Sequence, residues 1–116
     1  MALATDLPIY RVAYELLQLL AKLTQNYPRS YRQGLAREVF AEAQAVVVGI
    51  IRANTTRDKA PGLEQLRERL ETLKVLLRLS KDLHLISPGQ FGATVELTAA
   101  IGKQVAGWLN YARSRA

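Results

Sequence analysis

The stretch Leu63–Leu77 reads LEQLRERLETLKVLL, and its leucines recur at intervals of three and four residues. This spacing places side chains on one face of an α-helix, so the stretch predicts an amphipathic helix with a buried leucine stripe. We expect this helix to end near Leu83 or His84. The stripe consists of Leu63, Leu66, Leu70, Leu73 and Leu77.

Residues 1–53 carry the same periodicity in two segments. The first opens at Thr5-Asp6, interpreted as a helix cap, with Pro8 in the first turn. It stops near residues 26–28, because a residue that precedes a proline is pushed out of the helical conformation. The second is expected from about Tyr31 to about Ala53. Its middle, residues 45–51, is apolar almost all round, which is typical of a helix buried on more than one side. The apolar face of the first segment consists of Ile9, Val12, Ala13, Leu16, Leu20 and Leu23.

The longest polar break, residues 54–62, separates these two segments from the leucine-rich helix. A last helix is indicated by Ser87-Pro88, a cap followed by proline at the first helical position. Four amphipathic helices with short links predict an all-α fold, an antiparallel up-down-up-down four-helix bundle that forms one domain over residues 1–116. The buried face of the last helix is expected to hold Phe91, Val95, Thr98, Ile101, Val105, Leu109 and Ala112.

The composition excludes several classes of function. The 116 residues contain no Cys, which rules out disulfides and zinc–thiolate sites. The single histidine, His84, falls near a helix end, and the chain lacks the Glu-x-x-His pairs of a di-metal carboxylate bundle. We therefore expect a protein that is not an enzyme and has no catalytic residue, metal or cofactor. No apolar run is long enough for a membrane span and no secretory pattern opens the chain, so we expect a cytoplasmic protein without membrane contact.

Basic residues gather on the leucine-rich helix. The chain has 16 Lys and Arg against 10 Asp and Glu, a formal charge of +6, which fits a polyanionic partner and fits equally a soluble basic protein without one, so the positions of the cations have to decide. Four of these cations align beside the leucine stripe, where they predict a strip that binds the phosphates of RNA or DNA. The alternative is a solvated basic face whose charges pair with Glu71 and Asp82. The strip consists of Arg67, Lys74, Arg78 and Lys81, and the polar break adds Arg52, Arg57 and Lys59 as further candidates for nucleic-acid contact.

The predicted helices carry more apolar surface than a four-helix monomer needs to bury. A surplus of this kind marks an interaction surface, and self-association is the simplest use of it. The alternative is that wide apolar stripes pack a thick core. The residues predicted to form the oligomer interface are Phe40, Val47, Ile51, Leu76, Leu79, Leu83, Leu97 and Trp108. Three tyrosines at helix ends, Tyr27, Tyr31 and Tyr111, are candidates for stacking on bases or, more commonly, for packing.

Several motifs together resemble a known family. They are LPIY at residues 7–10, RANTTRDK at 52–59, LKVLLRLSKDL at 73–83 with LIS at 85–87, and IGKQVAGWL at 101–109. In this order they are similar to the four-helix-bundle family that includes the accessory variability determinant of diversity-generating retroelements and the proteins encoded in 23S ribosomal RNA intervening sequences. The resemblance covers nearly the whole chain.

The resemblance implies more than the residues do. Members of the retroelement branch form a homopentameric barrel of basic four-helix protomers, which associates with nucleic acid and with the retroelement reverse transcriptase. They support mutagenic reverse transcription of a template-repeat RNA, and the polymerase chemistry belongs to the transcriptase. By position in the matched motifs, Arg78 and Lys81 are then the best candidates for contacts to nucleic acid or to the transcriptase. The last motif contains Gly102, Gly107 and Trp108, which are expected to be packing residues. The alternative is a scaffold of the intervening-sequence type with no role in nucleic-acid binding.

Overall fold

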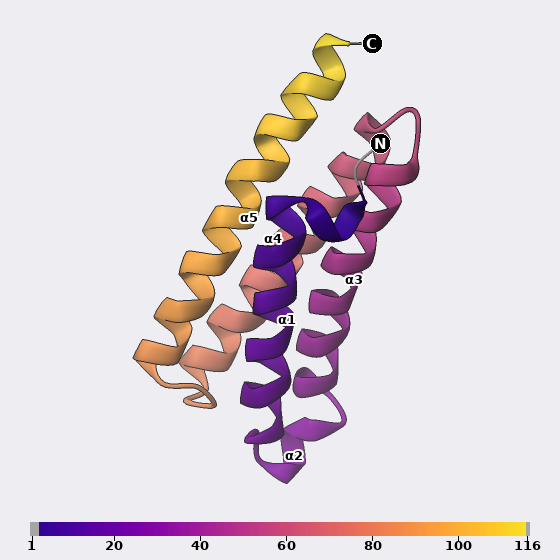
Figure 1. The fold of residues 1–116 in the computed structure, drawn as a ribbon. Coiled ribbons are helices and arrows are strands. Elements are labelled where there is room, and N and C mark those ends of the chain that lie inside the picture. Colours follow the sequence, from indigo (N-terminus) through magenta and orange to yellow (C-terminus); the bar gives the residue numbers. More distant parts are fainter. Residues whose placement is uncertain (1–2, 116) are drawn as a thin grey trace.

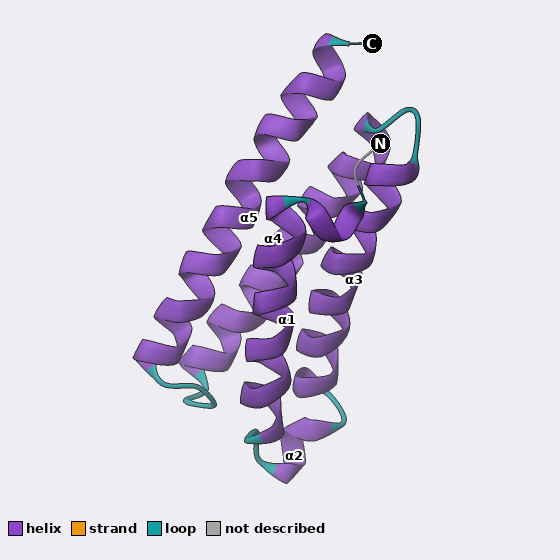
Figure 2. Ribbon diagram, in the orientation of Figure 1, coloured by secondary structure: helices purple, strands orange, loops and turns teal. Residues whose placement is uncertain are grey.

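Four long helices make up the computed structural model, which describes residues 3–115 (Figures 1 and 2). Within that range the chain forms no strand, and no helix combines the length with the hydropathy that a membrane crossing requires. A single 3₁₀ turn, Ala4–Asp6, precedes the first helix. The α-helices are α1 (Pro8–Gln25), α2 (Arg29–Arg32), α3 (Leu35–Thr55), α4 (Ala60–Asp82) and α5 (Pro88–Ser114).

The long helices form the predicted up-down-up-down bundle. Each packs mainly against two others: α1 against α3 and α5, and α4 against α3 and α5. Consecutive long helices run in opposite directions, and the short α2 closes the end of the bundle between α1 and α3 (Figure 1). The molecule measures 46 × 20 × 19 Å along its principal axes.

The core confirms the leucine stripe of α4, whose five leucines are all at most 2% exposed. They share one core cluster with the predicted apolar face of α1, where Leu16 and Leu20 are fully buried, and with Val105 of α5. Gly49 brings α3 close to α4, since a Cβ at that position would lie 3.1 Å from Leu66 Cδ1. The core is therefore built mainly from aliphatic side chains at helical spacing, as the sequence predicts.

The first two predicted helices begin at other residues than predicted. Thr5 and Asp6 belong to the 3₁₀ turn, and the residue that precedes α1 is Leu7, whose apolar side chain cannot accept a capping hydrogen bond. Pro8 takes the first helical position as predicted. The predicted second helix begins at Leu35 rather than near Tyr31. Tyr31 instead belongs to α2, a single turn that starts directly after Pro28.

The two ends of the α4–α5 connection have well-defined caps. Ser87 Oγ accepts a hydrogen bond of 3.0 Å from Gln90 N, and Gln90 Oε1 accepts one of 2.8 Å from Ser87 N, so the predicted cap of α5 is confirmed as a capping box. At the end of α4, Leu85 N donates to Ser80 O at 2.9 Å, the pattern of a Schellman motif. His84 occupies its left-handed position with a φ of 61°.

The register of α5 is partly shifted from the prediction. Thr98, Ile101, Val105 and Leu109 are buried as predicted, but Val95 is 45% exposed and Thr94 is buried in its place. The Thr94 hydroxyl is satisfied locally, because it donates to Phe91 O at 2.7 Å. A threonine therefore takes a core position that the apolar pattern assigned to valine.

Candidate nucleic-acid interface

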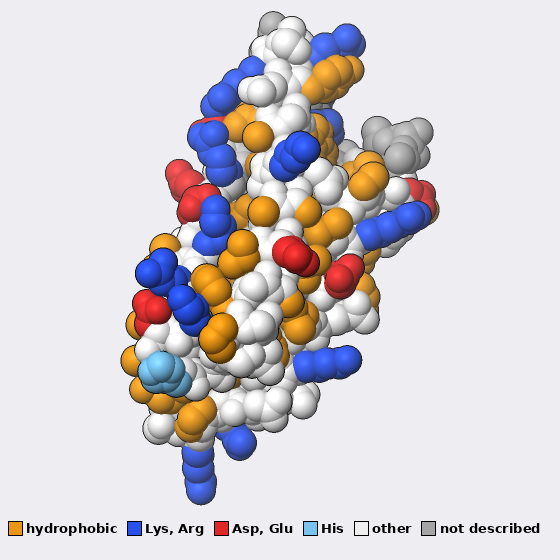
Figure 3. Space-filling view, turned by 90° about the vertical axis from the view of Figure 1, so that its left-hand side faces the viewer, with side chains coloured by type: hydrophobic (Ala, Val, Ile, Leu, Met, Phe, Trp, Pro, Cys, Tyr) orange, Lys and Arg blue, Asp and Glu red, His pale blue; other side chains and the backbone are white. Residues whose placement is uncertain are grey.

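The predicted basic strip lies on the side of α4 that faces α5. Two of its members, Lys74 and Arg78, line a groove of about 310 Å³ together with Phe91 and Val95 of α5. Lys81 lies over the Phe91 ring, with its Nζ 5.2 Å from the ring centroid. Figure 3 shows the face on which α5 lies, where Lys and Arg side chains gather along one edge with Asp and Glu side chains among them. The structure thus brings the strip together, but as a surface of mixed charge.

Three cations of the strip pair with carboxylates on their own helix. Such exposed pairs contribute only about 0–1 kcal/mol each and are screened by salt, so an incoming phosphate can displace the carboxylate. The strip therefore carries much less net charge than its cations alone suggest, as the solvated-face alternative expected. The ion pairs are Arg67 with Glu64 at 2.9 Å, Lys74 with Glu71 at 3.0 Å and Arg78 with Asp82 at 3.3 Å; Glu64 also pairs with Arg113 of α5.

The three cations predicted at the connection between α3 and α4 differ in their surroundings. Lys59 Nζ donates hydrogen bonds to the carbonyl oxygens of Ala53, Asn54 and Thr56 at 2.8, 3.1 and 2.9 Å. An ammonium group has three N–H donors, so these bonds use all of them to satisfy the end of α3. We therefore interpret Lys59 as a structural residue. Arg52 and Arg57 are exposed and remain candidates for phosphate contact.

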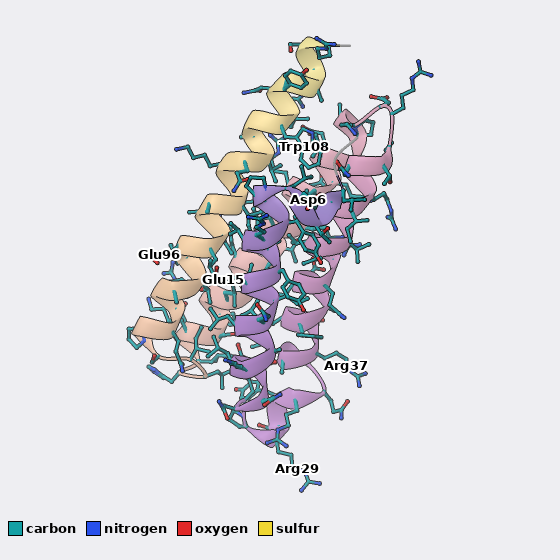
Figure 4. The ribbon with its side chains drawn as sticks, viewed as in Figure 1. Asp6, Glu15, Arg29, Arg37, Glu96 and Trp108 are labelled. Carbon is teal, nitrogen blue, oxygen red and sulfur yellow. The ribbon has the colours of Figure 1, made fainter. Side chains whose placement is uncertain are left out.

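A second group of cations, which the sequence reasoning missed, lies at the α2 end of the bundle. Arg29 and Arg32 belong to α2 and Arg37 to the first turn of α3. None of the three has an ion pair within the described residues, and Figure 4 shows Arg29 and Arg37 pointing away from the bundle. One signal in the sequence marks this group: between Glu15 and Glu38 the chain has no acidic residue. This end is therefore the more strongly basic surface.

The predicted oligomer interface divides into buried and exposed members. Val47 is only 7% exposed and belongs to the core, so it is not available on the surface of the protomer. The reason is that α3 is apolar almost all round in this region, and the neighbouring Val48 takes the exposed position. Phe40, Leu76, Leu97 and Trp108 are partly buried against the core, whereas Ile51, Leu79 and Leu83 are 40–43% exposed.

An exposed apolar row remains on α4. Val75, which the sequence reasoning did not single out, is 65% exposed and lies four residues before Leu79, which in turn lies four before Leu83. Residues four apart share one side of a helix. These three side chains therefore form a continuous apolar row, which points away from the leucine stripe of the core.

The predicted stacking tyrosines have different surroundings. Tyr27 is 1% exposed, so it packs in the core and offers no face to a base. Burial raises the pKa of its hydroxyl, and the nearby Ser80 side chain lowers it in part. The hydroxyl has no hydrogen bond of good geometry to another described residue. Tyr31 is partly buried, and Tyr111 is 61% exposed beneath the Arg115 guanidinium.

The comparisons with known proteins assign the family. The family described as bAvd-like matches residues 9–112, which is most of the chain. No curated protein matches the sequence. Among the described residues, no group of three or more His, Asp or Glu side chains is placed to hold a metal ion. With a helical bundle and a basic surface, the chain belongs to the bAvd-like family, the accessory variability determinants of diversity-generating retroelements.

Proposed function

We propose that this protein is a non-catalytic accessory subunit of a diversity-generating retroelement, which binds nucleic acid and the element's reverse transcriptase. Its membership of the bAvd-like family is the observation that carries the proposal. In this role the polymerase chemistry belongs to the transcriptase, and the accessory protein supports mutagenic reverse transcription by binding the nucleic acid and the enzyme together.

The charge of the protein supports binding to nucleic acid. A formal charge of +6 on 116 residues attracts a polyanion, and exposed arginines at the α2 end and at Arg52 and Arg57 are free to neutralise phosphates. Such contacts are electrostatic and independent of sequence.

The exposed apolar row of Val75, Leu79 and Leu83 supports self-assembly. Three large apolar side chains in a row on one helix are an unfavourable surface for a free monomer. A homopentameric barrel, which the family resemblance implies, buries such a row against a different face of the next protomer, because cyclic assemblies use heterologous interfaces.

Substituting both Val75 and Leu79 by Glu is expected to dissociate the assembly into monomers. The reason is that two carboxylates would lose their hydration in an apolar interface, whereas both positions are exposed in the protomer, so the fold is retained. Light scattering after size-exclusion chromatography measures the mass, and circular dichroism checks the fold. Tyr111→Glu, another exposed apolar position far along α5, is the matched control and should leave the mass unchanged. An unchanged mass in the double variant would exclude this row as the interface.

The function is tested by binding of the wild type and of Arg78→Glu/Lys81→Glu to template-repeat RNA and to the cognate transcriptase. We expect the wild type to retain both partners, and the double variant to lose roughly tenfold in RNA affinity because phosphate contacts are lost. Arg11→Glu/Lys22→Glu makes the same change of charge on the exposed face of α1 and controls for net charge. Equal RNA binding by the wild type and the strip variant would rule out the strip of α4 as the contact.

The ion pairs of the strip favour a second candidate function, a scaffold that assembles and binds a protein partner only. This function predicts a defined oligomer that retains the transcriptase but no RNA at physiological salt. The two functions are distinguished by RNA binding of the wild-type protein in the absence of the transcriptase. Retention of RNA favours the first function, and its loss favours the scaffold.

A further inference from the structure

A groove between α1 and α3 opens at the α2 end of the bundle. It is shallow and open to solvent, with a volume of about 370 Å³. The residues that line it and carry its chemistry are Gln25 of α1, Arg32 of α2, and Arg37, Phe40 and Gln44 of α3. Three elements of the chain therefore contribute to one concave surface.

The groove is basic, and no carboxylate lines it. Arg32 Nε donates a hydrogen bond of 3.2 Å to Tyr27 O, which fixes the side chain while leaving its terminal nitrogens available. Arg37 comes from a different helix and has no ion pair among the described residues. Two guanidinium groups on one groove are suited to a phosphate, which accepts several hydrogen bonds at once. This arrangement contrasts with the strip of α4, where carboxylates neutralise the cations.

The remaining lining suits a nucleobase. Phe40 is partly buried, so it is held against the core while it lines the groove. The exposed amides of Gln25 and Gln44 each donate and accept hydrogen bonds, which is what base edges require. Phosphate-binding cations, an aromatic side chain and amides are the elements of single-strand recognition.

A second aromatic platform lies further along the same side of α1. Tyr14 precedes Gln25 by eleven residues, about three helical turns, so both lie on one side of the helix about 16 Å apart along its axis. The Tyr14 ring is 45% exposed and stacks on Tyr10, with ring centroids 5.9 Å apart and planes within 10°. This pair gives a strand that leaves the groove a surface on which another base can stack.

We propose that the groove between α1 and α3 is a subsite for an unpaired nucleotide of a single-stranded nucleic acid. Arg32 and Arg37 hold the phosphate, and the base lies against Phe40 between the two amides. The occupant has to be unpaired, because neighbouring bases in a duplex cover the ring faces that Phe40 would contact. The inference rests on the proposed function and adds to it a preference for single strands and a location at the α2 end.

The test compares a fluorescent 12-nucleotide oligo(U) with a 12-base-pair RNA duplex, measured by anisotropy on the full chain at matched salt. We expect the wild type to prefer the single strand and Arg37→Glu to lose roughly tenfold in affinity for it. Arg37 is in the first turn of α3, where a carboxylate stabilises a helix, so the variant should fold. Arg29→Glu makes the same change of charge on the same end but outside the groove, and should weaken binding about threefold at most.

A second measurement does not depend on charge. Phe40→Leu keeps an apolar side chain against the core but removes the aromatic face. It should lower the affinity for oligo(U) roughly tenfold and leave the affinity for the duplex unchanged. Oligo(U) with 4-thiouridine should cross-link to the peptide that contains Phe40.

Three results would overturn the inference. They are equal effects of Arg37→Glu and Arg29→Glu, equal affinity for single strand and duplex, or binding of poly-glutamate as tightly as oligo(U) with the same loss in Arg37→Glu. The last result would identify a site for acidic proteins. Binding of neither nucleic acid by the wild type would instead contradict the proposed function, so the two failures are distinguishable.

Discussion

Leu20→Ala is expected to lower the free energy of unfolding by about 3–5 kcal/mol, the range for a leucine lost from a rigid core. Leu20 of α1 is 0% exposed, and it packs in the single core cluster that all four long helices share. The loss combines the transfer free energy of the removed methyl groups with the cavity that they leave. A cavity of this size cannot collapse easily, because helices pack on both sides of α1.

The matched control is Leu19→Ala, the same substitution at the neighbouring position. Leu19 is only partly buried, so its loss should cost about 1–2 kcal/mol, while the change in helix propensity is the same in both variants. Urea unfolding followed by circular dichroism, at one protein concentration for all samples, measures the difference. Equal losses for the two variants would show that α1 does not bury the face that carries Leu20 in the core.

Periodicity in the sequence was sufficient to predict the four long helices, but it did not resolve short or uniformly apolar segments. In the first half of α4, charged and polar residues lie between the leucines, so only one face can be buried. In residues 45–51 of α3 almost every side chain is apolar, and the pattern cannot distinguish buried Val47 from exposed Val48. The single turn of α2 is too short to show any period.

The candidate site was predictable where it depends on spacing along one helix. The strip of α4 follows from offsets that match the helical repeat, and its pairing with Glu71 and Asp82 follows from the same repeat. The role of Lys59 was not predictable, because its three bonds require the positions of carbonyl groups at the end of α3. The arginines of the α2 end come together only through the turn between α1 and α3.

Nucleic-acid binding is expected to fall by roughly 100-fold when the salt concentration rises from about 50 to about 200 mM. The estimate follows from about five phosphate contacts per protomer, each of which releases about 0.7 of a counterion from a single strand. Exposed arginines in the proposed contact surfaces support this count: Arg32 and Arg37 line the groove, Arg52 and Arg57 lie at the α3–α4 connection, and Arg78 belongs to the strip of α4.

The measurement is the slope of log affinity against log salt for oligo(U), with sedimentation at both salt concentrations to check that the assembly does not change. Arg37→Ala removes one phosphate contact without adding a negative charge, so it should reduce the slope by about 0.7. Arg69→Ala is the matched control, because Arg69 belongs neither to the groove nor to the strip of α4 and its guanidinium pairs with Glu42, so the slope should stay nearly unchanged. A slope near zero would mean that contacts other than phosphates dominate. A larger change in Arg69→Ala than in Arg37→Ala would exclude the groove as the source of the phosphate contacts, since only a cation that meets phosphate in the complex contributes to counterion release.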